Sequence, residues 1–168
     1  MQRQINFLKL FFIGVVAGIF GAIVKWGWEI PFPPRNPEVF FPIDSLERTT
    51  PPKIFLEQLG LPTDWFYIFS GIELPLSIFI VHIGFSVFFA LFYCFVAQKH
   101  HWITKYQGVL FGIFVYFFAH VLLMPIMQHT PPLGEIPFDE HFSEFFGHIV
   151  WMWSIEIVRN QLKNSLKV

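Results

Sequence analysis

Charged residues are scarce in this 168-residue chain. Asp, Glu, Lys and Arg together make up 14% of it, whereas soluble globular domains usually carry about a quarter. The formal net charge is −1, so the chain has no general basic surface, which argues against nucleic acid as a partner. Cys94 is the only cysteine, which excludes an internal disulfide bond. The sequence also lacks a Gly-x-Ser-x-Gly elbow, a P-loop and a paired-cysteine metal motif.

Hydrophobic residues are abundant instead, at 54% of the chain, and 24 residues are Phe. They fall into runs near 20 residues long, the length that crosses about 30 Å of hydrocarbon as a helix. The runs do not alternate as a β-barrel strand would. We therefore predict an all-α integral membrane protein, with residues 1–168 forming a single membrane domain. The four expected spans are about 7–30, 74–97, 107–127 and 142–158, and residues 31–73 form an outer loop.

The first span resembles a signal peptide at its start, because Arg3 and Lys9 precede the apolar run. The run is long, has no Ala-x-Ala-like exit, and ends in Trp26, Trp28 and Pro31. We expect a retained first span rather than a cleaved leader.

The basic residues predict the orientation. Seven lie at the two ends or in the turn between spans two and three, against three in the outer connections. The first group is Arg3, Lys9, Lys99, Lys105, Arg159, Lys163 and Lys167, and the second is Arg35, Arg48 and Lys53. Both termini are therefore expected in the cytoplasm.

The outer loop is rich in proline, which fixes φ and predicts an extended start. Beyond it, residues 53–60 are expected to form a short helix at the membrane interface, followed by Trp65, Phe66 and Tyr67. A partner-binding loop is the alternative. The prolines are Pro31, Pro33, Pro34 and Pro37.

The spans also suggest an internal repeat. Spans one and three share a pattern of small residues and an exit proline, and spans two and four share a Ser/Phe/His/Ile pattern. The first match pairs Gly14, Gly18 and Pro31 with Gly108, Gly112 and Pro125. The second pairs Ser77, Phe79, His82 and Ile83 with Ser143, Phe145, His148 and Ile149. Two tandem helix pairs related by an axis along the membrane normal are predicted. The four glycines are expected to serve close helix packing.

Ionisable residues inside the spans are costly, so each needs an explanation. All four spans carry one at a similar depth in the outer half: at 1.5 Å per residue, Lys25 lies about 9 Å before Pro31 and His120 about 8 Å before Pro125. We name this set the polar layer: Lys25, Glu29, His82, His120, Glu144 and His148.

Helical spacing favours an inward-facing polar layer. Lys25 and Glu29 share a face with Gly14 and Gly18 at 100° per residue. Three further pairs are four residues apart and so share faces of their helices: His82 with Ser86, Tyr116 with His120, and Glu144 with His148. Glu156, two turns beyond His148, extends this polar path or pairs with Arg159 at the interface.

Several roles for the polar layer stay open. Lys25 can snorkel to the surface with Glu29, and a membrane histidine often serves only as an interhelical hydrogen bond. Histidine titrates near pH 6.5, which suggests a pH-responsive cluster or a proton path. His82, His120 and His148 are weak candidates for metal ligands, but Lys25 would repel a divalent cation. No cofactor is expected.

Several blocks of sequence resemble the YagU family of bacterial inner-membrane proteins. They are Val24-Lys25-Trp26-Gly27 with Glu29, Pro31 through Pro37, His82-Ile83, Tyr93-Cys94, Thr130-Pro131-Pro132, Ser143 through His148, and Trp151 through Ile157. The resemblance covers nearly the whole chain, although the outer loop is shorter than is typical. It implies a multi-pass inner-membrane protein, and it implies no agreed activity and no catalytic residues.

The sequence therefore leaves four hypotheses for function. The first is a pH-responsive or proton-linked membrane protein acting through the polar layer. The second is a component of a small oligomeric transporter or channel for protons or a small ion, in which the chain is a homo-oligomer in the lipid bilayer. The third is a metal-binding protein or membrane enzyme, and the fourth is a non-catalytic scaffold.

Overall fold

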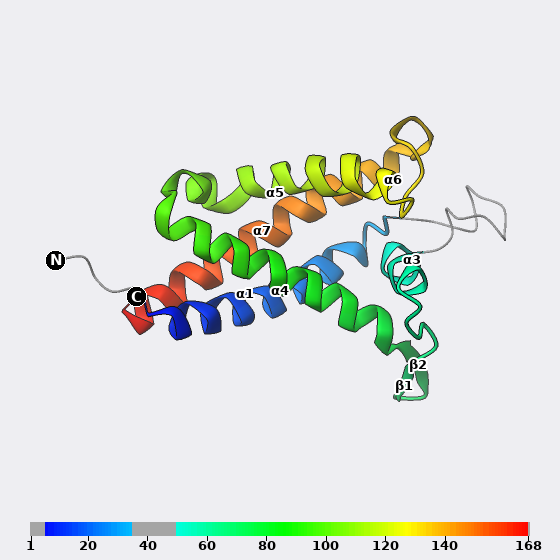
Figure 1. Ribbon diagram of the computed structural model, residues 1–168, viewed down its shortest axis with the longest axis horizontal. Coiled ribbons are helices and arrows are strands. Elements are labelled where there is room, and N and C mark those ends of the chain that lie inside the picture. Colours follow the sequence, from blue (N-terminus) through cyan, green and yellow to red (C-terminus); the bar gives the residue numbers. More distant parts are fainter. Residues whose placement is uncertain (1–5, 35–49, 168) are drawn as a thin grey trace.

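The computed structural model describes residues 6–34 and 50–167, and it is mostly helical (Figure 1). Three long helices, α1, α4 and α7, run beside a fourth path that is built of shorter pieces. The long helices are α1 (Phe7–Glu29), α4 (Leu76–Lys99) and α7 (Phe138–Leu166). The fourth path comprises η2 (His101–Gly108), α5 (Val109–Val115), the π-helix η3 (Tyr116–Leu123) and α6 (Met124–Ile126).

Three segments are long and apolar enough to cross a membrane: α1, α4 and the path from His101 to Ile126. They coincide with the first three predicted spans. The fourth predicted span, residues 142–158, lies inside α7, which contains more charged residues than the other three. The four-span count therefore stays a prediction, because the composition of α7 alone does not identify it as a span. Its charged residues within 138–159 are Asp139, Glu140, Glu144, Glu156 and Arg159.

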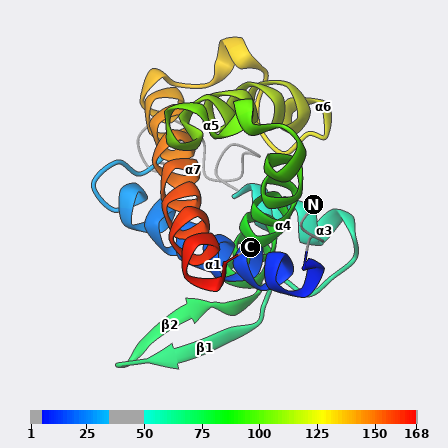
Figure 2. The same ribbon diagram turned by 90° about the vertical axis from the view of Figure 1, so that its left-hand side faces the viewer.

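The four helical paths surround a common interior (Figure 2). α7 packs along α1 on one side and along α5 on the other, while α4 packs along α1 and meets the α5 path at η2. α1 begins and α7 ends at one end of the bundle (Figure 1). That end carries Lys9, Lys99, Lys105 and Lys163, and we call it the basic end. The opposite end, the acidic end, carries Glu29, Glu73, Glu135 and Asp139.

Glycines permit the closest helix contacts. A Cβ on Gly18 would lie 2.5 Å from the Val87 Cα of α4. A Cβ on Gly112 would lie 2.6 Å from the His148 carbonyl oxygen of α7. Gly14 and Gly108 face α4 and α7 in the same way, against Leu91 and Met152 respectively. Each predicted glycine pair therefore lies where two helix backbones approach.

A buried hydrogen-bond chain joins three of the helices. Trp151 Nε1 donates to Ser86 Oγ at 2.7 Å, and Ser86 Oγ donates to the Gly18 carbonyl oxygen at 2.6 Å. Trp151 and Ser86 are both almost fully buried, so the chain fixes α7, α4 and α1 relative to one another. Ser86, expected beside His82 in the polar face of α4, thus belongs to the core.

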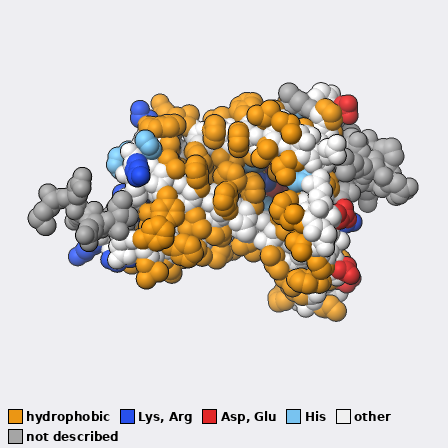
Figure 3. Space-filling model, in the orientation of Figure 1, with side chains coloured by type: hydrophobic (Ala, Val, Ile, Leu, Met, Phe, Trp, Pro, Cys, Tyr) orange, Lys and Arg blue, Asp and Glu red, His pale blue; other side chains and the backbone are white. Residues whose placement is uncertain are grey.

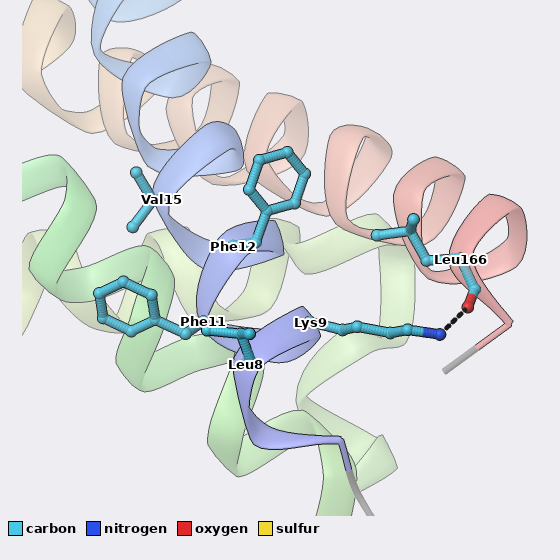
Figure 4. Close-up of a pocket in the computed structure, with 6 residues that line it drawn as sticks. All are labelled: Leu8, Lys9, Phe11, Phe12, Val15 and Leu166. Atoms are coloured by element: carbon cyan, nitrogen blue, oxygen red, sulfur yellow. Dashed lines mark hydrogen bonds between the residues drawn. The ribbon is translucent and has the colours of Figure 1, made fainter.

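The basic end is closed by a contact between the first turn of α1 and the last turn of α7. Lys9 Nζ donates to the Leu166 carbonyl oxygen at 2.9 Å (Figure 4). A lysine placed at a helix C-terminus compensates carbonyls that have no partner within the helix. Beside it lies an apolar groove of about 480 Å³, lined by Leu8, Lys9, Phe11, Phe12, Val15 and Leu166. This groove lies at the opposite end of α1 from the polar layer.

The outer connection contains more structure than the sequence predicted. The short helix is α3 (Pro51–Gln58), which begins at the proline pair. It is followed by a hairpin of β1 (Phe66–Phe69) and β2 (Ile72–Pro75). The turn residues Ser70 and Gly71 both have positive φ, as a two-residue hairpin turn of type I′ requires. Several residues of the predicted loop lie outside the described residues, namely Arg35, Pro37 and Arg48. η4 (Leu133–Glu135) lies between α6 and α7.

Replacing Gly18 with Ala should lower the melting temperature in detergent. The added methyl group would collide with the α4 backbone, and overpacking of this kind costs about 1–3 kcal/mol. The matched control is Gly84→Ala, because a Cβ at Gly84 meets nothing within 4 Å. That control should hold or raise the melting temperature, since Ala favours a helix over Gly by about 0.5–1 kcal/mol. Equal melting temperatures for the two variants would contradict the close contact.

Candidate functional site

An ammonium group shared by two carboxylates lies at the centre of the polar layer. Lys25, one turn before the end of α1, donates to Glu29 on the same helix. It also donates to Glu144 Oε2 of α7 at 3.2 Å. The three side chains are only 12%, 21% and 13% exposed, in the order Lys25, Glu29, Glu144. The four-residue spacing puts Glu29 directly beside Lys25, so α1 presents a ready-made ion pair to α7.

Two histidines lie against Glu144. His148 Nδ1 donates to the backbone carbonyl oxygen of Glu144 at 2.7 Å and lies 3.4 Å from Glu144 Oε2. His120 Nδ1 of η3 lies 3.9 Å from Glu144 Oε2, and His120 Nε2 lies 4.0 Å from Glu140 Oε1. Both nitrogens of His120 therefore face carboxylates of α7.

The π-helix η3 positions His120. One turn of wider helix there brings the rings of Tyr116 and His120 into a stacked arrangement with centroids 5.6 Å apart. Tyr116 Oη also forms a hydrogen bond with His141 Nδ1 at 2.8 Å. π-helical turns occur frequently at functional sites. Here the widened turn directs two polar side chains of one helix toward the start of α7.

His82 lies at the edge of the polar layer rather than at its centre. Its ring stacks on Trp26, with centroids 4.5 Å apart and planes inclined by 19°. This stacking holds the α4 histidine against α1, one residue along the chain from Lys25.

The ends of α1 and α7 are joined around the polar layer. Trp28 Nε1 donates to the Ser143 carbonyl oxygen at 3.0 Å. Ser143 Oγ donates to the Phe32 carbonyl oxygen, and the rings of Trp28 and Phe32 stack 4.4 Å apart. These contacts hold the final turn of α1 beside the second turn of α7, and so keep Lys25 within reach of Glu144.

Sequence reasoning missed two residues of this region, Glu140 and His141. Glu140 is buried and precedes Glu144 by four residues. The spacing 140, 144, 148 places three ionisable residues on one face of α7, and that periodicity could have identified Glu140. His141 carries no such signal, because only the fold brings Tyr116 of η3 beside it.

Glu156 lies away from the polar layer. It forms a buried ion pair with Arg159, with N···O distances of 2.5 and 2.7 Å. The guanidinium of Arg159 lies 5.9 Å above the Tyr93 ring. This pair lies toward the basic end, where it joins α7 to α4. The geometry gives Glu156 the ion-pair role rather than a place in a continuous polar path.

The histidines of the polar layer are not arranged together around one point. Within residues 6–34 and 50–167, no three His, Cys, Asp or Glu side chains are placed to hold a metal ion. The ring centroids of His120 and His148 lie 6.2 Å apart. His82 of α4 is elsewhere, because its ring stacks on Trp26 of α1. A metal ion bound by these histidines would also need the Glu144 carboxylate, and that carboxylate already accepts a hydrogen bond from Lys25.

A separate histidine joins the outer connection to the acidic end. His129 Nε2 lies 2.9 Å from Gln58 Oε1, and Gln58 Nε2 donates to the Met127 carbonyl oxygen at 2.9 Å. An amide oxygen can only accept, so the His129 ring donates through Nε2. Desolvation lowers the pKa of His129 from its ordinary value.

Comparison with known proteins gives a family and a relative. The model of the family described as "Protein of unknown function (DUF1440)" matches residues 19–157. The inner membrane protein YagU of Escherichia coli (strain K12) is 42% identical over 173 residues, which cover 92% of this chain and 84% of that protein. No solved structure matches the chain.

Replacing Lys25 with Met should destabilise the protein strongly, because it leaves Glu29 and Glu144 without their shared ammonium group. Removing one partner of a buried ion pair typically costs about 3–5 kcal/mol. The double variant Lys25→Met/Glu144→Gln should recover part of this loss, since it also removes the stranded charge. A double-mutant cycle on the melting temperature in detergent measures the coupling. Additive effects of the two substitutions would show that the contact carries no energy.

Docking of α3 should weaken as the pH falls. The folded-state pKa of His129 is lowered, so the undocked form takes up its proton first when the pH drops below about 6.5, the ordinary histidine value. Hydrogen–deuterium exchange of the α3 amides, corrected for intrinsic rates, should therefore speed up between about pH 7.5 and about pH 5. His129→Gln keeps an amide donor but cannot titrate, so its corrected rates should not change. A wild-type profile equally flat would contradict the assignment.

Proposed function

The chain belongs to the YagU (DUF1440) family of membrane proteins, and on that premise we propose that it is a four-span inner-membrane protein that responds to external pH. The polar layer is the responsive element. One observation carries the proposal: the two ring nitrogens of His120 lie 4.0 and 3.9 Å from carboxylate oxygens of Glu140 and Glu144, within ion-pair distance of both. Only a doubly protonated imidazole can donate at both nitrogens.

Charge balance supports the same reading. Lys25 contributes one positive charge and Glu29 and Glu144 two negative ones, so the three together carry a net charge of −1. An uncompensated charge at membrane depth is costly. His120 and His148 each lie within 4 Å of Glu144, and one proton on either ring offsets the net charge of these three groups. Glu140, whose Oε1 lies 4.0 Å from His120 Nε2, is a further carboxylate that favours a protonated ring. The layer is thus built to hold a proton and to change when the proton leaves.

A structural response can follow from the loss of that proton. A neutral imidazole donates through one nitrogen only, so His120 can then keep just one of its two carboxylate partners. His120 lies on a π-helical turn, and a π-helical turn differs from an α-helical one by a single residue of register. We propose that deprotonation releases one contact between η3 and α7 and shifts the register of η3.

The fourth span in this proposal is α7. It packs along both α1 and α5, and its central charged residues are paired inside the protein rather than exposed to lipid. Glu144 contacts Lys25, and Glu156 contacts Arg159. Paired, inward-facing charges are the form in which ionisable residues occur within membranes. Mean hydropathy penalises each charged residue of α7, whether or not that residue is paired inside the protein.

Orientation and repeat belong to the same proposal. The excess of lysine at the basic end, which holds the start of α1 and the end of α7, supports a cytoplasmic location for that end. The polar layer then faces outward. Two tandem helix pairs are supported by the glycine contacts, because Gly18 approaches α4 as Gly112 approaches α7. An oligomeric state is not required by any of these contacts.

Tryptophan fluorescence of the purified protein should change cooperatively between about pH 5 and pH 7. Trp26 stacks on His82, and Trp28 lies at the α1–α7 junction, so these indoles report on the polar layer. Replacing His82, His120 and His148 together with Ala should abolish the transition. The matched control is His100→Ala/His101→Ala, since both residues are exposed at the start of η2, at the basic end. A wild-type profile equal to that of the triple variant would overturn the proposal.

A flux measurement separates a sensor from a proton-conducting protein. Proteoliposomes with a pH-sensitive dye inside and an imposed pH step should acidify no faster than empty liposomes if the layer only senses pH. A leak that the triple histidine variant removes, and the His100→Ala/His101→Ala variant keeps, would assign proton transport to the same layer.

A further inference from the structure

The bundle is open on one side beside the polar layer. α4 contacts the α5 path at η2. It also contacts α5 through Phe92 and Tyr93, whose ring centroids lie 6.3 and 5.1 Å from that of Phe111. From there α4 diverges from α5 and η3 toward the acidic end (Figure 1). Figure 3 shows a gap in the apolar surface between them, with basic, acidic and histidine side chains visible at its base.

The gap has an apolar rim and a charged floor. Phe85 of α4 is 38% exposed and stacks on Trp151 of α7 at 6.2 Å, so it lies at the mouth of the opening. Lys25, Glu29 and Glu144, the charged residues at the centre of the polar layer, each retain some exposure. In a lipid bilayer this opening would face hydrocarbon. Partly exposed charges cannot be left there without a polar partner.

The charges on the floor select the partner. The trio of Lys25, Glu29 and Glu144 offers two carboxylates, which can bind the cationic group of a ligand, and one ammonium group. Glu29 is the most exposed of the three, and a carboxylate accepts several hydrogen bonds from a primary ammonium group. A quaternary ammonium has no N–H to give, so it would form no such bonds.

The same floor also offers a site for an anionic group. The Lys25 ammonium has three N–H donors, and its hydrogen bonds to Glu29 and Glu144 use two of them. The third can reach a phosphate oxygen placed beside the carboxylates. A ligand with a primary amine next to a phosphate therefore matches both charges of the site without adding net charge to it.

We propose that the gap between α4 and η3 admits a phospholipid with a zwitterionic phosphoethanolamine headgroup from the outer leaflet. The ammonium group binds Glu29 and Glu144, the phosphate binds Lys25, and the acyl chains leave through the apolar mouth past Phe85. Lys25 lies four residues before the end of α1, roughly 6 Å of helix rise, so the headgroup needs to descend little below the membrane surface. The inference rests on the proposed function only in placing the polar layer in the outer half of a membrane.

Native mass spectrometry of the whole protein, released from nanodiscs of defined composition, tests the proposal. Nanodiscs contain equal amounts of phosphatidylethanolamine, phosphatidylcholine and phosphatidylglycerol with identical acyl chains. The wild type should retain one phosphatidylethanolamine at least about fivefold more often than either other lipid, a preference near 1 kcal/mol. Glu29→Gln should abolish that preference, and Glu144→Gln should weaken it. Glu73→Gln, an exposed acidic-end control in the hairpin, should leave it unchanged.

The outcomes separate the alternatives. Equal retention of the three lipids, or an unchanged preference in Glu29→Gln, would overturn the proposal. A dimer mass without bound lipid would also overturn it, because a second copy would then close the gap. Preference for phosphatidylglycerol would assign the site to phosphate alone and contradict the role of the carboxylates. Lipid preference measured at constant pH does not depend on the fluorescence transition, so failure of the pH response would leave this result intact.

A thermal-shift measurement guards against misfolded variants. Phosphatidylethanolamine added to detergent-solubilised protein should raise the melting temperature of the wild type and of Glu73→Gln more than phosphatidylcholine does. Glu29→Gln should fold, because Glu29 lies in the last turn of α1, and should respond equally to both lipids. A larger response to phosphatidylethanolamine in Glu29→Gln would count against the site.

Discussion

The protein depends on one ammonium group held between two carboxylates. Lys25 cannot lie inside an apolar bundle unless Glu29 and Glu144 accept its hydrogen bonds. That requirement fixes how α1 and α7 are placed, because Glu144 must face α1 at the level of the last α1 turn. The Trp28 and Ser143 contacts at the same level reinforce the placement. Helix packing at the acidic end is therefore set by charge, whereas at the basic end it is set by small and aromatic side chains such as Ala97 and Tyr93.

Buried charges are paired in different ways at the two ends of the bundle. Toward the basic end, Glu156 and Arg159 are three residues apart and form a complete ion pair within α7. Toward the acidic end, the partners come from different helices, and two histidines and a π-helical turn share the carboxylates. The hydrogen bonds of that pair are made within one helix, so they persist when neighbouring helices move, even though the Arg159 guanidinium also lies above the Tyr93 ring of α4. A set of charges distributed over α1, η3 and α7 changes whenever they move, and this difference is why the acidic end is the candidate functional region.

Much of this organisation could be predicted from the amino-acid sequence. Apolar run length identified α1, α4 and the third path, and the four-residue spacing of Lys25 and Glu29 predicted their shared face. Local patterns could not supply contacts between helices. The Tyr116–His141 hydrogen bond and the place of Ser86 in the core depend on how separate segments meet. The hairpin was missed although Ser70-Gly71 is a turn signal between apolar runs, because its aromatic residues also fit an interfacial segment. The π-helical turn of η3 has no sequence signature in its apolar surroundings.

The fourth helix has a consequence for how the chain enters the membrane. α7 is synthesised after α1, and its central carboxylate is a poor candidate for partition into lipid by itself. The matching ammonium group lies on α1, which leaves the ribosome earlier. In the proposed four-span arrangement, insertion of α7 therefore depends on α1 already standing in the bilayer. The long-range pair of Lys25 and Glu144, 119 positions apart in the chain, then couples acceptance of the later helix to the presence of the earlier one.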